Sequence, residues 1–387
     1  MTDIEVIDTF DTFCGLENVW NELLSKSDID IPFMTFEYLC FWWKLYGSAQ
    51  QPLILVVKDA GAIVAVAPLM RKKIIWRGLP VTAITFLANY HSTRTGLIVA
   101  HEKENLFTLI FDYVRQHYLF DMFSFDLFIK NTATDRLLRA ALGTTHMKYV
   151  AMQGELSPYI AVAGDWAAYE ESRSKKFLKN IKYRNNLFAR DGGYEITDFS
   201  GEHIEESLQM VMQVSQKTAQ YAQKTAIVNS SDSTTYHTAL ARMAAQSGWL
   251  RISGLRHKGV FIAFEFKLLY KKTVYLLKVG FDTAYARFAP GTILLRHSIQ
   301  GSFSEKYQEF NFLGKNEPHK MEWTSSLREN QKYWIFNDTA YGRFLCFWEM
   351  NVVAEIKRLF TRFKSLAGNY PAAAGEKFHD KRDNSCL

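Results

Sequence analysis

The turn RFAPGT at residues 287–292 is the part of the sequence with the clearest potential for chemistry. It follows a strand-like run over residues 273–281 and opens an apolar, helix-like run. The first N–H groups of a helix and its positive dipole end bind anions. Gly291 lets a phosphate approach the backbone because it has no Cβ, while Thr292 adds a hydroxyl group and Arg287 a cation. These residues alone leave two interpretations open, a phosphate-binding turn and an ordinary start of a helix.

A carboxylate within an apolar strand is the candidate for proton transfer. Glu265 lies in the run FIAFEFKLL, between Phe264 and Phe266. If its side chain points into a cleft, burial raises the pKa of the carboxyl group towards the range of a general base. Successive side chains of a strand point to opposite faces. Glu265 therefore lies across the strand from the two phenylalanines, and an outward orientation stays open.

Other reaction classes lack their motifs. The sequence has no GxSxG turn, and the Gly-Lys pair of FLGKNEP has neither the upstream glycine nor the following Ser or Thr of a P-loop. The ten histidines show no HxH or HExxH spacing and no pairing with cysteines. We therefore expect no metal site.

Length and composition suit two domains. The chain has 387 residues, of which 48% are hydrophobic, enough for real cores. Its net charge of +6 is mild for this length, and we expect no DNA partner. The four cysteines lack CxxC spacing, which is typical of reduced thiols. The first residues lack the basic and apolar regions of a secretory signal, and charges interrupt the most apolar run, so we expect a cytoplasmic protein.

Hydrophobic periodicity predicts the same order of elements in both halves, β-α-α-β-β-β-α-β-α-β. In the second half we expect strands at 194–199, 249–256, 260–270, 273–281, 309–314 and 331–337, with helices at 201–220, 231–248 and 292–307 and a short helical segment before the last strand. In the first half we expect strands at 4–10, 52–60, 62–73, 83–90, 122–130 and 149–154, with helices at 16–27, 36–47, 104–118 and 134–143. The alternation predicts an α/β fold with a mixed sheet flanked by helices in each half.

Four ordered motifs resemble one branch of the GNAT superfamily of acyl-CoA N-acyltransferases, the CelD/BcsL-like and FemAB-like proteins with tandem GNAT folds. These motifs are SPYIAVAGDW at 157–166, the basic helix SRSKKFLKNIKYRNNL at 172–187, YARFAPGTILL at 285–295 and FNFLGKNEPHKMEW at 310–323. The turn keeps the basic residue of the family pattern R/Q-x-x-G-x-G/A but has Pro290 and Thr292 at two of its small-residue positions. Asn311 stands where the family usually has Asp, and His319 where it usually has Tyr.

The resemblance implies acyl transfer from acyl-CoA, bound as a co-substrate, and assigns roles in the second half. The turn would hold the CoA pyrophosphate, and a backbone N–H of the preceding strand would hold the acyl carbonyl. The implied cofactor-binding residues are Leu277, Lys278, Val279, Arg287, Gly291, Thr292 and Ile293. The implied catalytic candidates are Glu265 as a base, Tyr285 near the CoA sulfur or packed in the loop, Lys320 near an anionic group, and His319 as a base or an exposed histidine.

The equivalent turn of the first half, ANYHSTRTGLIVA, has no Pro-Gly-Thr before a helix, so we expect this half to bind no CoA and to shape the acceptor cleft. Its candidate substrate-binding residues are Tyr38, Trp42, Tyr90, His91 and Arg94. We expect three segments: an N-terminal GNAT-like domain at 1–156, a C-terminal GNAT domain at 157–345, and a basic helix with a flexible tail at 346–387.

The leading hypothesis is an N-acyltransferase acting on an amine of a sugar or amino-acid precursor in exopolysaccharide or envelope synthesis. A small-molecule acceptor is the expected partner. Acyl carrier protein or aminoacyl-tRNA as the donor stays open because the helix at 175–190 is rich in Lys and Arg. A non-catalytic GNAT-fold scaffold for a polysaccharide synthesis complex stays open as well, as does peripheral association with a membrane surface. The oligomeric state is open.

Overall fold

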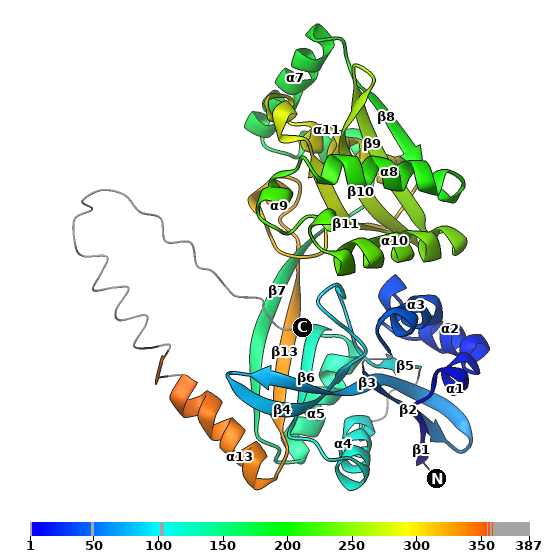
Figure 1. The fold of residues 1–387 in the computed structure, drawn as a ribbon, viewed down its shortest axis with the longest axis vertical. Coiled ribbons are helices and arrows are strands. Elements are labelled where there is room, and N and C mark those ends of the chain that lie inside the picture. The colour runs from blue at the N-terminus through cyan, green and yellow to red at the C-terminus, as the bar shows by residue number, and fades with distance from the viewer. Residues whose placement is uncertain (1, 48–49, 101–103, 354, 357, 359–387) are drawn as a thin grey trace.

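The computed structural model describes residues 2–47, 50–100, 104–353, 355, 356 and 358, and within them the strands form one continuous mixed sheet (Figure 1). The first half contributes β1 (Thr2–Ile7), β2 (Gln51–Asp59), β3 (Ala62–Trp76), β4 (Leu79–Phe86), β5 (Ile98–Val99), β6 (Met122–Ile129) and β7 (Tyr149–Ala161). The second half contributes β8 (Glu195–Phe199), β9 (Leu250–His257), β10 (Val260–Tyr270), β11 (Thr273–Phe281), β12 (Glu309–Asn311) and β13 (Leu327–Phe336). The spatial order is β1-β2-β3-β4-β6-β13-β7-β12-β11-β10-β9-β8, with β5 on β3.

Helices flank the sheet in both halves, which confirms the α/β fold with a mixed sheet. The first half has α1 (Phe10–Cys14), α2 (Glu17–Ser25), η1 (Pro32–Met34), α3 (Phe36–Tyr46), α4 (Leu106–His117) and α5 (Ala133–Thr144). The second half has α6 (Trp166–Glu171), α7 (Lys175–Arg190), η3 (Gly201–His203), α8 (Ile204–Ser215), α9 (Ala219–Ala222), η4 (Ile227–Asn229), α10 (Ser231–Gln246), η5 (Thr283–Phe288), α11 (Pro290–Ser304) and α12 (Pro318–Met321). The expected order of elements is thus present twice.

Alternation along the strands builds a core on each side of the sheet. In β2, Ile54 and Val56 pack in one cluster with α1–α3, whereas Leu53 and Leu55 pack in another with α4 and α5. In the second half, Phe264 and Phe266 of β10 face α8 and α10. The opposite face packs against α7 and α11. Helices α3 and α10 belong to the same core cluster, so the two halves share a hydrophobic contact.

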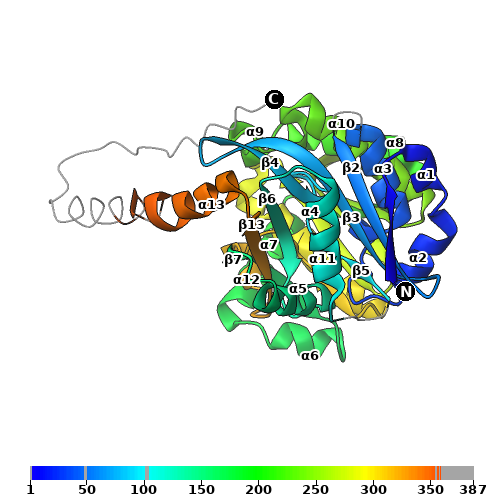
Figure 2. The same cartoon turned by 90° about the horizontal axis from the view of Figure 1, so that it is seen from below.

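Two long strands connect the halves. β7 pairs with β12 of the second half through Tyr159–Ala161 and with β13 through Tyr149–Pro158. β13 follows all other strands of the second half, yet it pairs with β6 of the first half. Figure 1 shows both strands running from one half into the other, and Figure 2 shows them side by side from below. The expected boundary between residues 156 and 157 therefore falls within β7.

The C-terminal segment packs at the edge of the first half after β13. Helix α13 (Ala340–Phe347) is followed by a π-helical turn, η6 (Trp348–Val353), and Leu345 and Cys346 of α13 lie in a buried cluster with Trp76 and Trp334 (Figures 1 and 2). Most of the expected basic helix and tail at 346–387 lies outside the described residues. Among the described helices, none is long and apolar enough to cross a membrane.

Candidate active site at the splayed edge of β11

β11 and β12 separate after a short parallel contact and leave a V-shaped opening between them. Their pairing covers Thr273–Tyr275 on β11 and Glu309–Asn311 on β12, while β11 continues to Phe281 without a partner on that edge. The register with β10 also shifts here, because Phe266 pairs with Lys278 whereas Lys267 pairs with Leu276. Leu277 is thus the extra residue of a β-bulge, which bends the strand and re-aims its side chains.

A cavity of about 530 Å³ fills this opening. Predicted residues of four elements line it: Glu265 on β10, Leu277, Lys278 and Val279 on β11, Gly291 and Thr292 on α11, and His319 and Lys320 on α12. Its apolar wall comes from Phe264, Leu276, Phe281, Leu295, Phe312 and Trp323. Phe312 and Trp323 were not among the residues predicted from the sequence. Most of the predicted donor-side residues therefore share one cavity.

The start of α11 forms one end of the cavity. Thr292 N–H donates to the carbonyl of Ala289 at 3.0 Å, and Ile293 N–H donates to the same oxygen at 3.3 Å. Gly291 N–H has no acceptor among the described residues, nor has the Thr292 hydroxyl a partner there. A Cβ on Gly291 would lie 3.4 Å from the Phe281 ring, an ordinary contact. Packing therefore does not require glycine at 291, whereas an anion approaching its N–H would.

Cations lie close to this helix terminus without entering the cavity wall. Arg184 of α7 donates a hydrogen bond to the backbone carbonyl of Arg287. The Arg287 side chain is 68% exposed, lies 3.7 Å from Asp191, and stacks over Phe288. The side chain of Ile293 on α11 is buried in the hydrophobic core and does not line the cavity. The expected charge at the turn is therefore present on the surface beside it.

The open edge of β11 presents a backbone donor to the cavity. Asp282 N–H donates to the carbonyl of Ile262 on β10 at 2.8 Å, and the register between Phe281 and Lys278 is regular. Donors alternate in direction along an antiparallel strand. The N–H groups of Lys278 and Gly280 therefore point at β10, and the N–H of Val279 points at the opening. Of the three predicted backbone donors, Val279 is the one that this alternation aims at the cavity.

Glu265 belongs to a buried polar network between β10 and α11. The residue is 1% exposed, and its Oε2 accepts hydrogen bonds from Ser298 and, at 3.3 Å, from the Lys267 ammonium. Lys267 also donates to Ser253 and Ser298, each at 2.5 Å. Glu265 Oε1 is enclosed and has no partner among the described residues. The carboxylate thus faces inward, and its occupied oxygen serves a buried ion pair.

The Lys278 side chain occupies the junction between two cavities. It lines the 530 Å³ cavity and a second cavity of about 250 Å³, together with Leu277, Phe312 and Lys320. It has no hydrogen bond or ion pair to any described residue. Burial alone lowers the pKa of its ammonium group. The bulge at Leu277 places this partly buried cation on the side of β11 that faces α10.

The second cavity lies between α10 of the second half and the loop after β4 of the first. His237 of α10 lines it and is 3% exposed. Its Nδ1 lies 2.7 Å from the carbonyl of Ser233, so Nδ1 carries the proton and Nε2 is left as an acceptor. Burial lowers the pKa of His237 to about 3. His237 is therefore neutral near pH 7 and presents a hydrogen-bond acceptor.

His91, a candidate for substrate binding, lines the same cavity from the first half. Its Nε2 lies 3.1 Å from Asp232 at the start of α10, and its ring stacks on Tyr236 with centroids 4.2 Å apart. Burial lowers the pKa of His91, and Asp232 opposes that effect. Tyr90, another lining residue, is 75% exposed and donates to the same carboxylate. Asp232, Tyr236 and His237 all come from one helix that the sequence analysis assigned no function.

Lys320 and His319 lie at the wall formed by α12. The Lys320 ammonium donates to the carbonyls of Leu313 and Lys315 at 3.1 and 3.2 Å and lies 2.7 Å from Glu317. These three partners use its three N–H groups, so Lys320 holds the loop between β12 and α12 in place. His319 is exposed at the cavity wall, where partial desolvation lowers the pKa of its ring.

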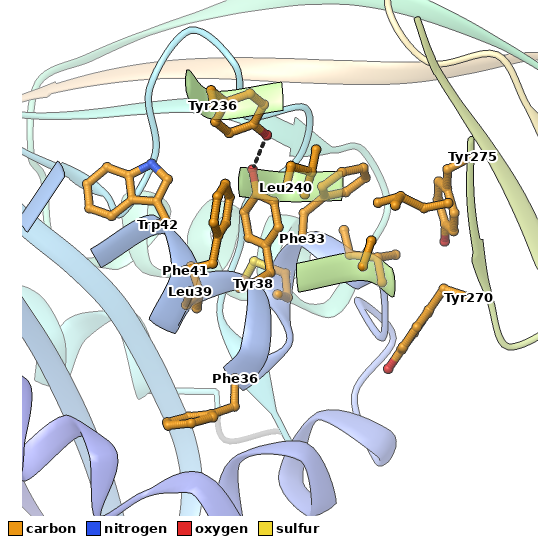
Figure 3. Packing of buried hydrophobic residues seen from close by; sticks show 14 of the residues in the cluster. Phe33, Phe36, Tyr38, Leu39, Phe41, Trp42, Tyr236, Leu240, Tyr270 and Tyr275 are labelled. Carbon is orange, nitrogen blue, oxygen red and sulfur yellow. Dashed lines mark hydrogen bonds between the residues drawn. The ribbon is translucent and has the colours of Figure 1, made fainter. Parts of the chain in front are cut away.

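The remaining candidates lie outside both cavities. Tyr285 packs near His257 and Phe288 in η5. Tyr38 and Trp42 are each 1% exposed within the core of α3 (Figure 3). Arg94 is buried and donates to Asn311 Oδ1 at 3.1 Å. None of these side chains lines either cavity.

Asn311, one of the departures from the family pattern, bridges two charged groups. Its Oδ1 accepts from Arg94, and its Nδ2 donates to Glu309 at 2.5 Å. Glu309 also forms a bidentate pair with Arg328 of β13, at 2.8 and 2.7 Å. An aspartate could not donate to Glu309. The amide therefore suits a network that connects the first half to β12 and β13.

A family model described as an acetyltransferase (GNAT) domain matches residues 175–321. This segment contains the splayed strands, the bulge and the α11 turn described above. The segment is similar to a GNAT domain. The match leaves the CelD/BcsL-like branch unresolved, and no curated protein matches the chain. Within the described residues, no group of three His, Cys, Asp or Glu side chains is arranged to hold a metal ion.

Solved structures with a similar fold extend the likeness beyond the GNAT domain. A conserved protein of unknown function from Bacteroides thetaiotaomicron is 17% identical, with a TM-score of 0.55 over 87% of this chain and 100% of that one. FemX is 10% identical, with a TM-score of 0.55 over 87% and 98%. The C-terminal domain of a proposed lysylphosphatidylglycerol synthetase from Agrobacterium fabrum is 12% identical, with a TM-score of 0.52 over 87% and 96%. At these identities the likeness concerns the fold alone.

Proposed function

We propose that the protein is an N-acyltransferase that moves an acyl group from acyl-CoA to the amine of a small molecule. The observation that carries this proposal is that the two cavities adjoin at Lys278, which lines both of them. One cavity ends at an anion-binding helix start in the GNAT domain. The other is lined by neutral imidazoles and lies between the halves. A donor and an acceptor can therefore meet at one point while each keeps its own site.

The residues at the donor cavity fit a CoA thioester. Gly291 N–H and the Thr292 hydroxyl are unpartnered at the positive end of α11, and Arg184 and Arg287 lie beside it. The apolar wall suits an uncharged linker and acyl chain. When bound, the thioester supplies an activated acyl group.

Two groups of this chain can stabilise the negative charge that develops on the acyl oxygen. Val279 N–H points into the opening from the unpaired edge of β11. The Lys278 ammonium lies at the meeting point of the cavities and has no other anion to bind among the described residues. Donors fixed before the reaction need no reorganisation when the charge appears, which lowers the barrier.

His91 is the best-placed base for the acceptor amine. When its ring takes a proton, Asp232 at 3.1 Å balances the new charge. His237 has no such carboxylate partner, and its pKa of about 3 is too low to keep a proton. We therefore assign His237 Nε2 to orienting the amine. Glu265 is enclosed and already paired, so we assign it to positioning β10 against α11.

The proposal extends to the chemical class of the acceptor and to the carrier of the acyl group. The resemblance to CelD/BcsL-like and FemAB-like proteins supports an amino sugar or amino-acid precursor in envelope or exopolysaccharide synthesis. Acyl carrier protein or aminoacyl-tRNA is the alternative donor, supported by exposed lysines on α7 at positions 175, 176, 179 and 182, next to the α11 start. A non-catalytic scaffold would retain the fold but would have no use for joined cavities.

Turnover tests the proposal directly. The protein is incubated with acetyl-CoA and a panel of amino sugars and amino acids, and release of free thiol and the mass of the product are measured. We expect acylation of at least one amine, with His91→Gln reducing the rate by about 100-fold because proton transfer is lost. His203→Gln serves as the matched control, because His203 is an exposed histidine of η3 that lines neither cavity. Thiol release without an acylated amine, or equal rates in both variants, would contradict the assigned chemistry.

A further inference from the structure

One face of the first-half sheet carries a polar groove, and α13 packs at one end of it, where Leu345 and Cys346 contact the cluster of Trp76 and Trp334. The opposite face is apolar and packs against α4 and α5. The groove has a volume of about 580 Å³ and runs across β3, β4, β6, β13 and β7. Although it is open, several of its side chains are shielded: Thr85 is 8% exposed and Ser124 is 7% exposed. A solvated sheet face would leave such residues more exposed, so the groove is a shaped depression.

Among the described residues of the groove, one cation lacks a hydrogen bond or ion pair. Lys332 lies 2.7 Å from Asp126, and Glu155 lies 3.4 Å from Lys315, so both carboxylates of the groove already face an ammonium group. Lys72 has no hydrogen bond or ion pair to any described residue. Burial is the main cause that lowers the pKa of the Lys72 ammonium. The charge of Asp126 opposes this effect, and the nearby Lys332 adds to it. This position therefore favours an external anion that would neutralise the charge.

A hydroxyl group lies in the same groove. Ser124 of β6 lines it, and its Oγ has no hydrogen-bond partner among the described residues. β4 lies between β3 and β6, and its residue Ala83 pairs with both Lys72 and Met122. Lys72 and Ser124 thus sit on one face of the sheet, on strands separated by β4. A cation and a hydroxyl donor together suit the oxygens of a phosphate or carboxylate.

The groove continues into the cavity assigned to the acceptor. Both are lined by Tyr90, Ser92, Leu127, Glu155 and Asn330. The acceptor cavity in turn joins the donor cavity at Lys278. The donor cavity, the acceptor cavity and the groove therefore adjoin one another in a row, from the α11 start, past the imidazoles, to this face of the first-half sheet.

We propose that the acceptor is an elongated molecule whose anionic end binds at Lys72 and Ser124 while its amine lies beside Lys278. This inference rests on the proposed acyl transfer for the identity of the amine, and on the groove alone for the anion. A compact amine would fill only the cavity at His237. An elongated, anionic amine would extend from the acceptor cavity into the groove, where the Lys72 ammonium would balance its negative charge.

Chemical protection of Lys72 tests the anion subsite without any acyl donor. The full chain is treated with limiting acetic anhydride, with and without inorganic pyrophosphate, and modification of each lysine is measured by peptide mass spectrometry. The Gly291→Glu variant is used as the background, so that pyrophosphate does not bind at α11. Lys73, exposed on the other face of the same strand, is the internal control. We expect at least fivefold protection of Lys72 and none of Lys73.

Further experiments compare phosphate, carboxylate and chloride as the anion that protects Lys72. Succinate in place of pyrophosphate shows whether a carboxylate suffices, and equal protection by sodium chloride would mean ionic strength only. Lys72→Gln should weaken pyrophosphate binding, measured by calorimetry, at least tenfold, and Lys73→Gln should not. Equal modification of Lys72 with and without pyrophosphate overturns the subsite even if the protein acylates amines. Protection of Lys72 in a protein that acylates no amine leaves the subsite standing and overturns the proposed function.

Discussion

The hydroxyl groups of Tyr38 and Tyr236 lie 3.0 Å apart and join the two halves of the molecule (Figure 3). Tyr38 comes from α3 of the first half and Tyr236 from α10 of the second. Both rings are buried, at 1% and 3% exposure. Tyr236 carries the stacked ring of His91 on its face. The hydrogen bond therefore fixes the surface on which the proposed base rests.

Tyr38→Phe should weaken this contact. The change leaves the buried Tyr236 hydroxyl without its partner, so we expect a loss of about 1–2 kcal/mol in the free energy of unfolding. The acylation rate should fall as His91 loses its fixed position, with the affinity for CoA unchanged. Urea denaturation and steady-state kinetics measure both effects. Tyr113→Phe on α4, whose hydroxyl has no hydrogen-bond partner among the described residues, is the control. Equal stability of the two variants would show that the Tyr38 hydroxyl contributes nothing.

Lys278→Met should separate catalysis from stability. The variant removes an ammonium group that is partly desolvated and unpaired among the described residues, so the free energy of unfolding should stay the same or rise. The value of kcat should fall by about 10- to 100-fold because the developing oxyanion loses a donor. Lys272→Met, exposed in the turn between β10 and β11, should behave as the wild type. A loss of CoA affinity with unchanged kcat would instead make Lys278 a donor-binding residue.

His237 should make the folded state sensitive to acid. Its pKa is about 3 in the folded protein against 6.5 for an unperturbed histidine. The folded pKa is depressed, so stability is complete above pH 6.5 and is lost as the pH falls towards 3. Between pH 6.5 and about pH 5, the wild type should lose about 2 kcal/mol relative to His237→Gln. His146→Gln, an exposed histidine, should show the slope of the wild type in urea denaturation. Parallel pH profiles for wild type and His237→Gln would place the His237 ring in solvent.

Glu265→Gln should destabilise the protein more than it slows the chemistry. The variant leaves the Lys267 ammonium, which is 2% exposed, without its buried counter-charge. Breaking such a pair from one side costs about 3–5 kcal/mol. Ser298→Ala removes one donor to the same carboxylate and should cost about 1–2 kcal/mol. Thermal unfolding measures both. A stable Glu265→Gln protein with an abolished rate would return Glu265 to the role of general base.

Periodicity alone predicted the strands and helices of both halves because each element has a local amphipathic pattern. The strand pattern of residues 260–281 and the helix after the RFAPGT turn are examples, and both are present as β10, β11 and α11. The pairing of β13 with β6 could not be predicted in this way. That pairing joins Asn330 to Ile129 across the chain, and no local pattern encodes a partner so distant.

In the site, too, features that depend on neighbouring residues were predictable, whereas features that depend on pairing with distant strands were not. Gly291 was predicted at the start of a helix, and it lies in the first turn of α11. From the sequence, Lys278 was predicted only as a backbone donor. The bulge at Leu277 turns its side chain towards α10, and that bulge depends on the pairing of β11 with β10, which the sequence pattern does not reveal. His237 was overlooked within an ordinary amphipathic helix. The sequence signal for His237 was its position four residues after Ser233. In a helix this spacing brings the His237 ring near the Ser233 carbonyl, which fixes the tautomer of His237.

Calorimetric titration with CoA of the wild type and of Gly291→Glu tests the central claim most directly. An acidic residue in the first turn of a helix stabilises the helix dipole, so Gly291→Glu should unfold at the same temperature as the wild type or higher. The same charge should repel a pyrophosphate at α11. Gly301→Ala, later in the same helix, is the control. The account predicts saturable binding of CoA to the wild type and to Gly301→Ala, and none to Gly291→Glu. No binding to the wild type at millimolar CoA, or equal binding by all three proteins, would contradict it.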